Sequence, residues 1–111
     1  MGYLYHITEK SAWEQAQADG VYTAPSLDTE DFIHLSARDQ VIGTANRFYR
    51  GRENLLLLEI DRDRLQSRLQ YDPVPEHGTF PHLYGPLNLD AIVRATPLIP
   101  ENDGGFTTEQ I

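Results

Sequence analysis

The sequence LLLLEI at residues 55–60 is the most informative segment for the architecture of this chain. It is too apolar to alternate between a buried face and a solvent-exposed face, and it is too short to form a helix between Gly51 and the charged residues that follow it. A short, continuously apolar strand is typical of a sheet that is covered on both faces. We therefore expect residues 55–60 to form a central strand, with other elements packed on each side of it.

The residues before this strand predict two helices that alternate with short strands. Thr8 is placed to cap the first helix, and Gly20 is placed to end it in a left-handed conformation. Ser36 and Asp39 predict the start of the second helix, which carries an apolar stripe along one side. The predicted elements are a strand at 3–7, a helix at about 9–19, a strand or loop at 21–29 with a turn at 25–26, a strand at 32–35, and a helix that includes residues 41–49.

The residues after the central strand predict further strands among loops. Pro73 and Pro75 are expected to stop an edge strand, and Pro97 indicates a strand at or near a sheet edge. The predicted elements are a helical turn at 61–65, a strand at 69–72, a loop-rich segment at 74–90, a strand within 91–99, and a loosely ordered tail at 100–111. Strands outnumber helices, and both helices come early, which favours an α+β fold with a twisted, mainly antiparallel sheet and two helices beside it. We expect one domain over residues 1–99.

The composition excludes several classes of protein. The 111 residues carry a net charge of −8, so long-range repulsion disfavours general binding of nucleic acid or of an anionic membrane. Cysteine is absent, which excludes disulfides, thiolate metal sites and cysteine nucleophiles. No apolar run approaches the roughly 20 residues that a membrane helix needs, and the first residues lack the basic region of a signal peptide. We expect a cytoplasmic protein, and no feature of the sequence decides its oligomeric state.

Two histidines lie on predicted strands in the first third of the chain. His6 shares a strand face with Leu4, and a lone strand histidine is usually structural. His34 shares a face with Phe32 and Ser36, so an imidazole, an aromatic ring and a hydroxyl line up beside the start of a helix. Free N–H groups at a helix start attract anions, which makes this a candidate anion site. The alternative for Ser36 is that it only caps the helix.

The sequence FPHLYGP at residues 80–86 is the most unusual segment of the chain. Its two outer prolines restrict the backbone on either side of His82 and Tyr84, which face the same way if the segment is extended. A stiff backbone of this kind can hold a functional side chain in place. The alternative is a rigid surface turn with Tyr84 packed into the core. Glu59 is a further candidate, either as a general acid or base or as a solvated carboxylate at a strand end.

Six segments together resemble the DUF952 family, which consists of small bacterial proteins of unknown function. The resemblance covers nearly the whole chain, from residue 3 to residue 99, and it rests on the combination and order of the segments. They are LYHIT at 4–8, PSL at 25–27, FIHLS at 32–36, ANRFY at 45–49, LLEID at 57–61 and FPHLYGPL at 80–87.

The family has been grouped with the ADP-ribosyltransferase-like superfamily. This grouping implies a split, curved sheet that cradles NAD or an ADP-ribose-like nucleotide. By position, the first superfamily residue, which holds a ribose or phosphate, corresponds to His6, and the second corresponds to His34. The third, usually a glutamate, corresponds to His82. Because an imidazole replaces that carboxylate, protein ADP-ribosylation fits poorly, whereas phosphate handling, hydrolysis of NAD or ADP-ribose, or nucleotide binding fits better.

The leading hypothesis is a small domain that binds NAD, ADP-ribose or another phosphorylated nucleotide in a histidine-lined cleft and acts on it as a hydrolase or transferase. The expected catalytic residues are His6, His34 and His82, and the expected ligand contacts are His6, Ser36, Arg47 and Tyr84. No metal is expected. Two alternatives stay open. One is a non-catalytic binding or interaction module whose histidines are structural, and the other is a three-histidine metalloenzyme, although spacings of 28 and 48 residues match no local metal motif.

Overall fold

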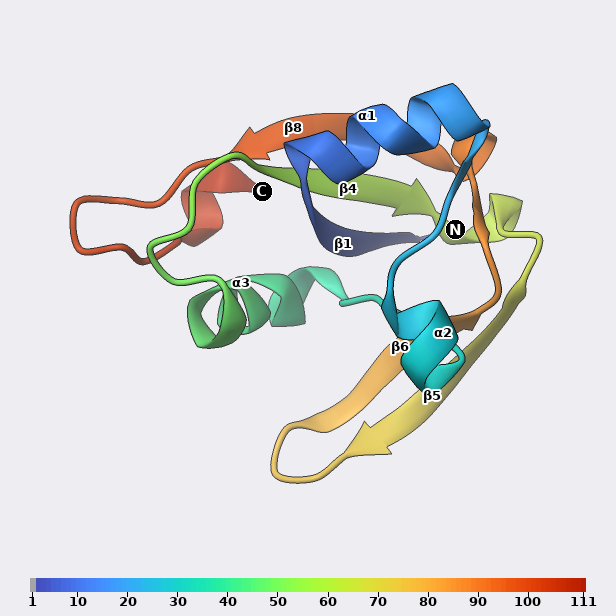
Figure 1. Ribbon diagram of the computed structural model, residues 1–111. Helices are drawn as coiled ribbons and strands as arrows, with labels where there is room; N and C mark the ends of the chain where they lie inside the picture. Colours follow the sequence, from blue (N-terminus) through green and yellow to red (C-terminus); the bar gives the residue numbers. More distant parts are fainter. Residues whose placement is uncertain (1) are drawn as a thin grey trace.

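The computed structural model describes residues 2–111 and has an α+β architecture (Figure 1). Its strands pair antiparallel in three small sheets with the orders β1-β4-β8, β2-β7 and β3-β6-β5. The strands are β1 Tyr3–Glu9, β2 Val21–Tyr22, β3 Ile33–His34, β4 Leu55–Asp61, β5 Arg68–Val74, β6 Gly78–Tyr84, β7 Leu87–Asn88 and β8 Ile92–Leu98. The α-helices are α1 Lys10–Asp19, α2 Ser26–Glu30 and α3 Arg38–Phe48, and short 3-10 helices span Arg62–Arg64, Leu89–Ala91 and Thr108–Gln110.

The apolar segment at residues 55–60 lies in β4, and its predicted central position is confirmed. β4 pairs with β1 on one side and with β8 on the other. Its residues alternate between two hydrophobic clusters, because Leu58 packs in the same cluster as Ala16 of α1, whereas Leu57 packs in the same cluster as Val41 of α3. The two helices therefore cover opposite faces of this sheet, as Figure 1 shows.

The first helix lies close to its predicted bounds, but Thr8 does not cap it. β1 continues through Glu9, which is the N-cap residue and makes no side-chain capping bond. The Thr8 side chain points instead into the core, where its hydroxyl contacts the hydroxyl of Tyr22 at 2.9 Å. Gly20 ends the helix as predicted, with a φ of 80° and its N–H donated to the carbonyl of Ala16.

The segment between β2 and α3 differs from the prediction at two points. A third α-helix, α2, replaces the predicted turn, with Pro25 at its N-cap, where a fixed φ suits the first helical turn. Ser36 does not cap α3, because its backbone forms a β-bridge with Tyr5 of β1. At the start of α3, the backbone N–H of Ala37 donates to the side chain of Gln40 instead.

The β5–β6 hairpin is the largest departure from the predicted elements, since residues 74–90 are expected to be mostly loop. The pairing of β5 with β6 continues through Pro73, which lies opposite Thr79. Pro73 therefore does not stop the strand, and it is tolerated because β5 is an edge strand. Pro81 lies within β6 itself, and a proline inside a strand argues against that strand when only the sequence is read.

The C-terminal segment at residues 100–111 makes specific contacts where the sequence predicts a loose tail. Phe106 is 3% exposed and packs in the cluster shared by α3 and β4. The side chain of Asn46 donates to the Phe106 carbonyl at 3.1 Å and accepts from the Phe106 N–H at 2.7 Å. Gln110 makes two hydrogen bonds of 2.7 Å with the backbone of Ile99. Within residues 2–111, no helix is both long enough and apolar enough to cross a membrane.

Candidate functional site

One face of the β3-β6-β5 sheet carries several polar and ionisable side chains. His82 of β6 lies between His34 of β3 and Gln70 of β5 in the strand register, so these three side chains form a row. The opposite face packs on the core through Ile33 and Leu83, which are fully enclosed. We define the histidine face as His34, Arg68, Gln70, Asp72, Phe80, His82 and Tyr84.

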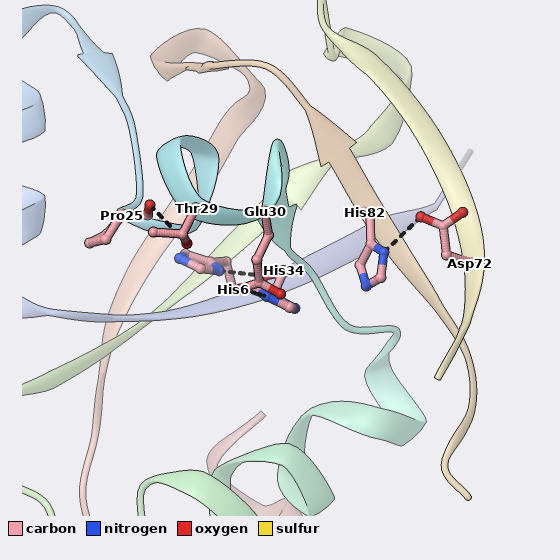
Figure 2. A network of polar contacts seen from close by, with 7 residues as sticks. All are labelled: His6, Pro25, Thr29, Glu30, His34, Asp72 and His82. Carbon is pink, nitrogen blue, oxygen red and sulfur yellow. Dashed lines mark hydrogen bonds and ion pairs between the residues drawn. The ribbon is translucent and has the colours of Figure 1, made fainter. Parts of the chain in front are cut away.

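Asp72 fixes the orientation of His82 on this face. The Nδ1–H of His82 donates to Asp72 Oδ2 at 2.8 Å (Figure 2). The same carboxylate accepts hydrogen bonds from the Tyr84 hydroxyl and, at 2.6 Å, from the Gln70 side-chain amide. These hydrogen bonds, that of Tyr84 first, lower the pKa of Asp72 to about 2, because each stabilises the ionised form. In turn, the hydrogen bond to Asp72 raises the pKa of Tyr84.

The second ring nitrogen of His82 makes no hydrogen bond within residues 2–111. Asp72 requires a proton on Nδ1, so the neutral ring carries its lone pair on Nε2. Within residues 2–111, Nε2 has no hydrogen-bond partner, and the one buried side-chain polar atom without a partner is Thr107 Oγ1. His82 as a whole is only 4% exposed, and its ring stacks on Phe32 with ring centroids 3.9 Å apart. A carboxylate-oriented imidazole whose Nε2 lone pair is not used within the protein is suited to act as a general base toward a water molecule that reaches it.

His34 extends the site from the sheet to the surface. Its ring meets the His82 ring edge-on at 5.3 Å and the Phe32 ring at 4.8 Å. The side chain is 53% exposed, and its Nε2 lies 3.0 Å from a carboxylate oxygen of Glu30 at the end of α2 (Figure 2). Arg68 adds a positive charge on the same face, with its guanidinium 4.6 Å from the centre of the Tyr84 ring.

His6 belongs to a separate, buried network. Its Nδ1 lies 2.6 Å from the backbone oxygen of His34, and its Nε2 lies 2.8 Å from the Tyr22 hydroxyl. Burial lowers the pKa of His6 to about 4, so the ring is neutral near pH 7. A carbonyl oxygen can only accept, so Nδ1 of the neutral ring carries the proton. The Tyr22 hydroxyl lies between His6 Nε2 and the Thr8 hydroxyl, at 2.8 and 2.9 Å. His6 therefore ties β1 to the backbone of β3.

The remaining predicted site residues lie outside the histidine face. Ser36 is 5% exposed, and its hydroxyl lies 3.4 Å from that of Thr44. Arg47 lies in the last turn of α3, roughly 14 Å along the helix from its start, and its guanidinium covers the Phe48 ring. Glu59 lies in β4 opposite Tyr5 and Arg94. The structure thus brings together His34, His82 and Tyr84, and it separates them from His6, Ser36 and Arg47.

Two cavities of about 720 and 690 Å³ lie near the C-terminal segment, and none of the predicted histidines lines either of them. The side chains of residues 2–111 also include no group of three or more histidines, cysteines, aspartates or glutamates arranged to hold a metal ion. Both ring nitrogens of His6 already contact other groups of the protein, so this ring does not present a free nitrogen for a three-histidine zinc site.

Asp72 is the functional candidate that sequence reasoning missed, although a signal for it exists. Arg68, Gln70 and Asp72 alternate with Leu69 and Tyr71, which is the period of a strand with one polar face. Pairing that strand with the FPHLYGP segment at 80–86 would have placed Asp72 beside His82. The register of this pairing depends on the turn between the strands, where the sequence indicates only a flexible loop.

The fold and the site together define a small antiparallel α+β domain with a carboxylate-oriented histidine on one face of the β3-β6-β5 sheet. The model of a family of proteins of unknown function, DUF952, matches residues 7–95, and the chain belongs to that family.

Solved structures of protein CC0527 from Caulobacter crescentus are similar to this chain over almost its whole length. A crystal structure has a TM-score of 0.88 at 31% identity and covers 96% of this chain and 95% of that chain. A solution NMR structure has a TM-score of 0.83 at 34% identity and covers 96% of this chain and 93% of that chain. The search of curated proteins found no match.

Proposed function

We propose that the histidine face binds a phosphorylated nucleotide of the NAD or ADP-ribose type, as the grouping with ADP-ribosyltransferase-like proteins implies. The observation that carries the proposal is the His82–Asp72 hydrogen bond beside the exposed ring of His34. Phosphate oxygens accept hydrogen bonds, and Arg68 and His34 can donate them from one side of the sheet. The ring of Tyr84 on this face and the ring of Phe32, which stacks on His82, offer an apolar surface for a ribose or a base.

Hydrolysis is the reaction that the His82–Asp72 pair supports best. His82 Nε2 takes a proton from a water molecule while the water oxygen forms a bond to a phosphorus atom of the ligand. The bond from that phosphorus to its bridging oxygen breaks, and the electron pair leaves with the second phosphate. Asp72 stays ionised and stabilises the imidazolium, which then releases its proton to solvent.

Calorimetry with NAD, ADP-ribose and AMP at concentrations up to millimolar tests binding. We expect heat of binding with at least one of these ligands and an affinity at least about tenfold lower in His82→Asn, because a charge-assisted contact network is lost. His77→Asn is the matched control, since His77 is an exposed histidine in the turn of the same hairpin. Absence of binding in the wild type, or equal losses in the two variants, would contradict the proposal.

A non-catalytic binding module is the second candidate. One observation favours it. Both ring nitrogens of His6, one of the three histidines of the leading hypothesis, make hydrogen bonds within the protein. This candidate predicts ligand binding without turnover. Phosphorus NMR of the ligand after prolonged incubation separates the two, because only an enzyme produces new phosphate resonances.

A further inference from the structure

Glu30, at the end of α2, contacts the exposed histidine of the histidine face. Its carboxylate oxygen lies 3.0 Å from His34 Nε2, and both side chains are about half exposed, at 49% and 53%. A carboxylate oxygen and a phosphate oxygen are the same kind of acceptor for an imidazole N–H. The contact that an anionic ligand would make with His34 is therefore already made by the protein itself.

We propose that Glu30 is an internal competitor for the anionic group of the ligand and thereby lowers the affinity of the site for anions. This inference rests on the proposed function. A ligand gains the His34 contact only when its anion displaces the Glu30 carboxylate. Breaking an isolated, exposed ion pair costs little free energy, so the displacement reduces the affinity only a few-fold.

The helix that carries Glu30 is suited to such a displacement. α2 has five residues, none of them buried, and Asp31 directly after it has a φ of 74°. Aspartate is one of the non-glycine residues that adopt this left-handed conformation most readily, so α2 ends directly after Glu30. The Glu30 side chain can rotate away into solvent while β3 and its register with β6 stay unchanged.

The charges around His34 indicate that removing the charge of Glu30 strengthens anion binding. Glu30 faces it from α2, the ionised Asp72 lies behind His82 on β5, and Arg68 supplies a positive charge from β5. Neutralising Glu30 removes the carboxylate that directly contacts the ring, so the balance on this face shifts toward anion binding.

Calorimetry with ADP-ribose and with inorganic phosphate, at constant ionic strength, tests the competition. Glu30→Gln is expected to bind both probes about two- to fivefold more tightly than the wild type, which is the range that an exposed ion pair represents. Asp28→Asn is the matched control, because it removes one negative charge from an exposed residue of the same helix. Its affinities should equal those of the wild type.

A double variant completes the test. In a His34→Asn background, Glu30→Gln should give no gain, because the contact for which Glu30 competes is gone. A gain that persists in this background, or equal affinities of Glu30→Gln and Asp28→Asn in a chain that does bind, would overturn the competition and leave the proposed function standing. If neither the wild type nor any variant binds either probe, both proposals fail.

Discussion

At the scale of single residues, partners rather than burial distinguish the two enclosed histidines. His6 and His82 are 9% and 4% exposed. The two ring nitrogens of His6 contact a backbone carbonyl and a tyrosine hydroxyl, so both are hydrogen-bonded. Burial lowers the pKa of His6, so its ring is neutral near pH 7. His82 contacts a carboxylate through one nitrogen, and its other nitrogen makes no hydrogen bond within residues 2–111. The first arrangement stabilises the fold, and the second leaves a group that can accept a proton.

The buried His6 makes stability fall in mild acid. A histidine in the unfolded chain takes up its proton near pH 6.5, whereas folded His6 does so only near pH 4, so the unfolded state binds more protons between these values. The contribution to the free energy of unfolding is fully present above pH 6.5 and is lost toward pH 4, by on the order of 3 kcal/mol. Urea denaturation at about pH 7 and pH 4.5 measures it. His6→Gln, which does not titrate, should lose less stability than the wild type, and equal losses would contradict this assignment.

Asp72 should control the ionisation of Tyr84. Its carboxylate accepts the hydrogen bond of the Tyr84 hydroxyl and raises the pKa of that group. In Asp72→Asn the negative charge is absent, so the pKa of Tyr84 should fall toward the ordinary value of about 10. An NMR titration with labelled tyrosine measures the change, with Tyr84→Phe to identify the resonance. An unchanged pKa in Asp72→Asn would show that the hydrogen bond does not form.

At the scale of elements, sequence reasoning succeeds where one signal dominates. The apolar segment at 55–60 specifies a doubly covered strand, and Gly20 specifies a helix end, since each of these signals is compatible with one local structure. β6 is not predictable in the same way, because Pro81 counts against a strand unless its tertiary neighbours are known.

The candidate site could be predicted only in part. His34 and His82 can be recognised as candidates from the sequence. Their contact cannot be predicted, because it depends on the register between β3 and β6. Asp72 can be placed beside His82 only when the pairing of β5 with β6 is known. Ser36 is a case in which a clear sequence pattern misleads. The sequence predicts a helix cap at Ser36, but in the structure its backbone forms a bridge to β1.

The connection after β6 provides a test at this scale. Gly85 has a φ of 149°, and a Cβ added there would lie 2.5 Å from Ser67 Oγ, which is held by a 2.7 Å hydrogen bond to the Pro86 carbonyl. Gly85→Ala should therefore lower the free energy of unfolding by about 1 to 3 kcal/mol more than Gly20→Ala. Gly20 is the matched control, because its φ is also positive but no atom lies within 4 Å of the added Cβ. Equal losses in urea denaturation would contradict the predicted clash.

At the scale of the whole molecule, the C-terminal segment completes the second hydrophobic cluster. Phe106 fills a position among residues of β1, β4 and α3 that would otherwise face solvent. Phe106→Ala should lower the free energy of unfolding by about 3 kcal/mol, because a buried aromatic ring is removed. Phe48→Ala is the control, since Phe48 is 65% exposed and should cost far less. Similar losses in denaturant titrations would show that the segment is not part of the folded core.

The proposal that the histidine face is the ligand site is tested most directly by an amide NMR titration of the isotope-labelled chain with ADP-ribose. The account predicts saturable shifts concentrated at residues 32–34, 68–72 and 80–84, which His82→Asn weakens and His77→Asn leaves unchanged. Shifts confined to the cavities beside the C-terminal segment, or no shifts at millimolar ligand, would contradict it.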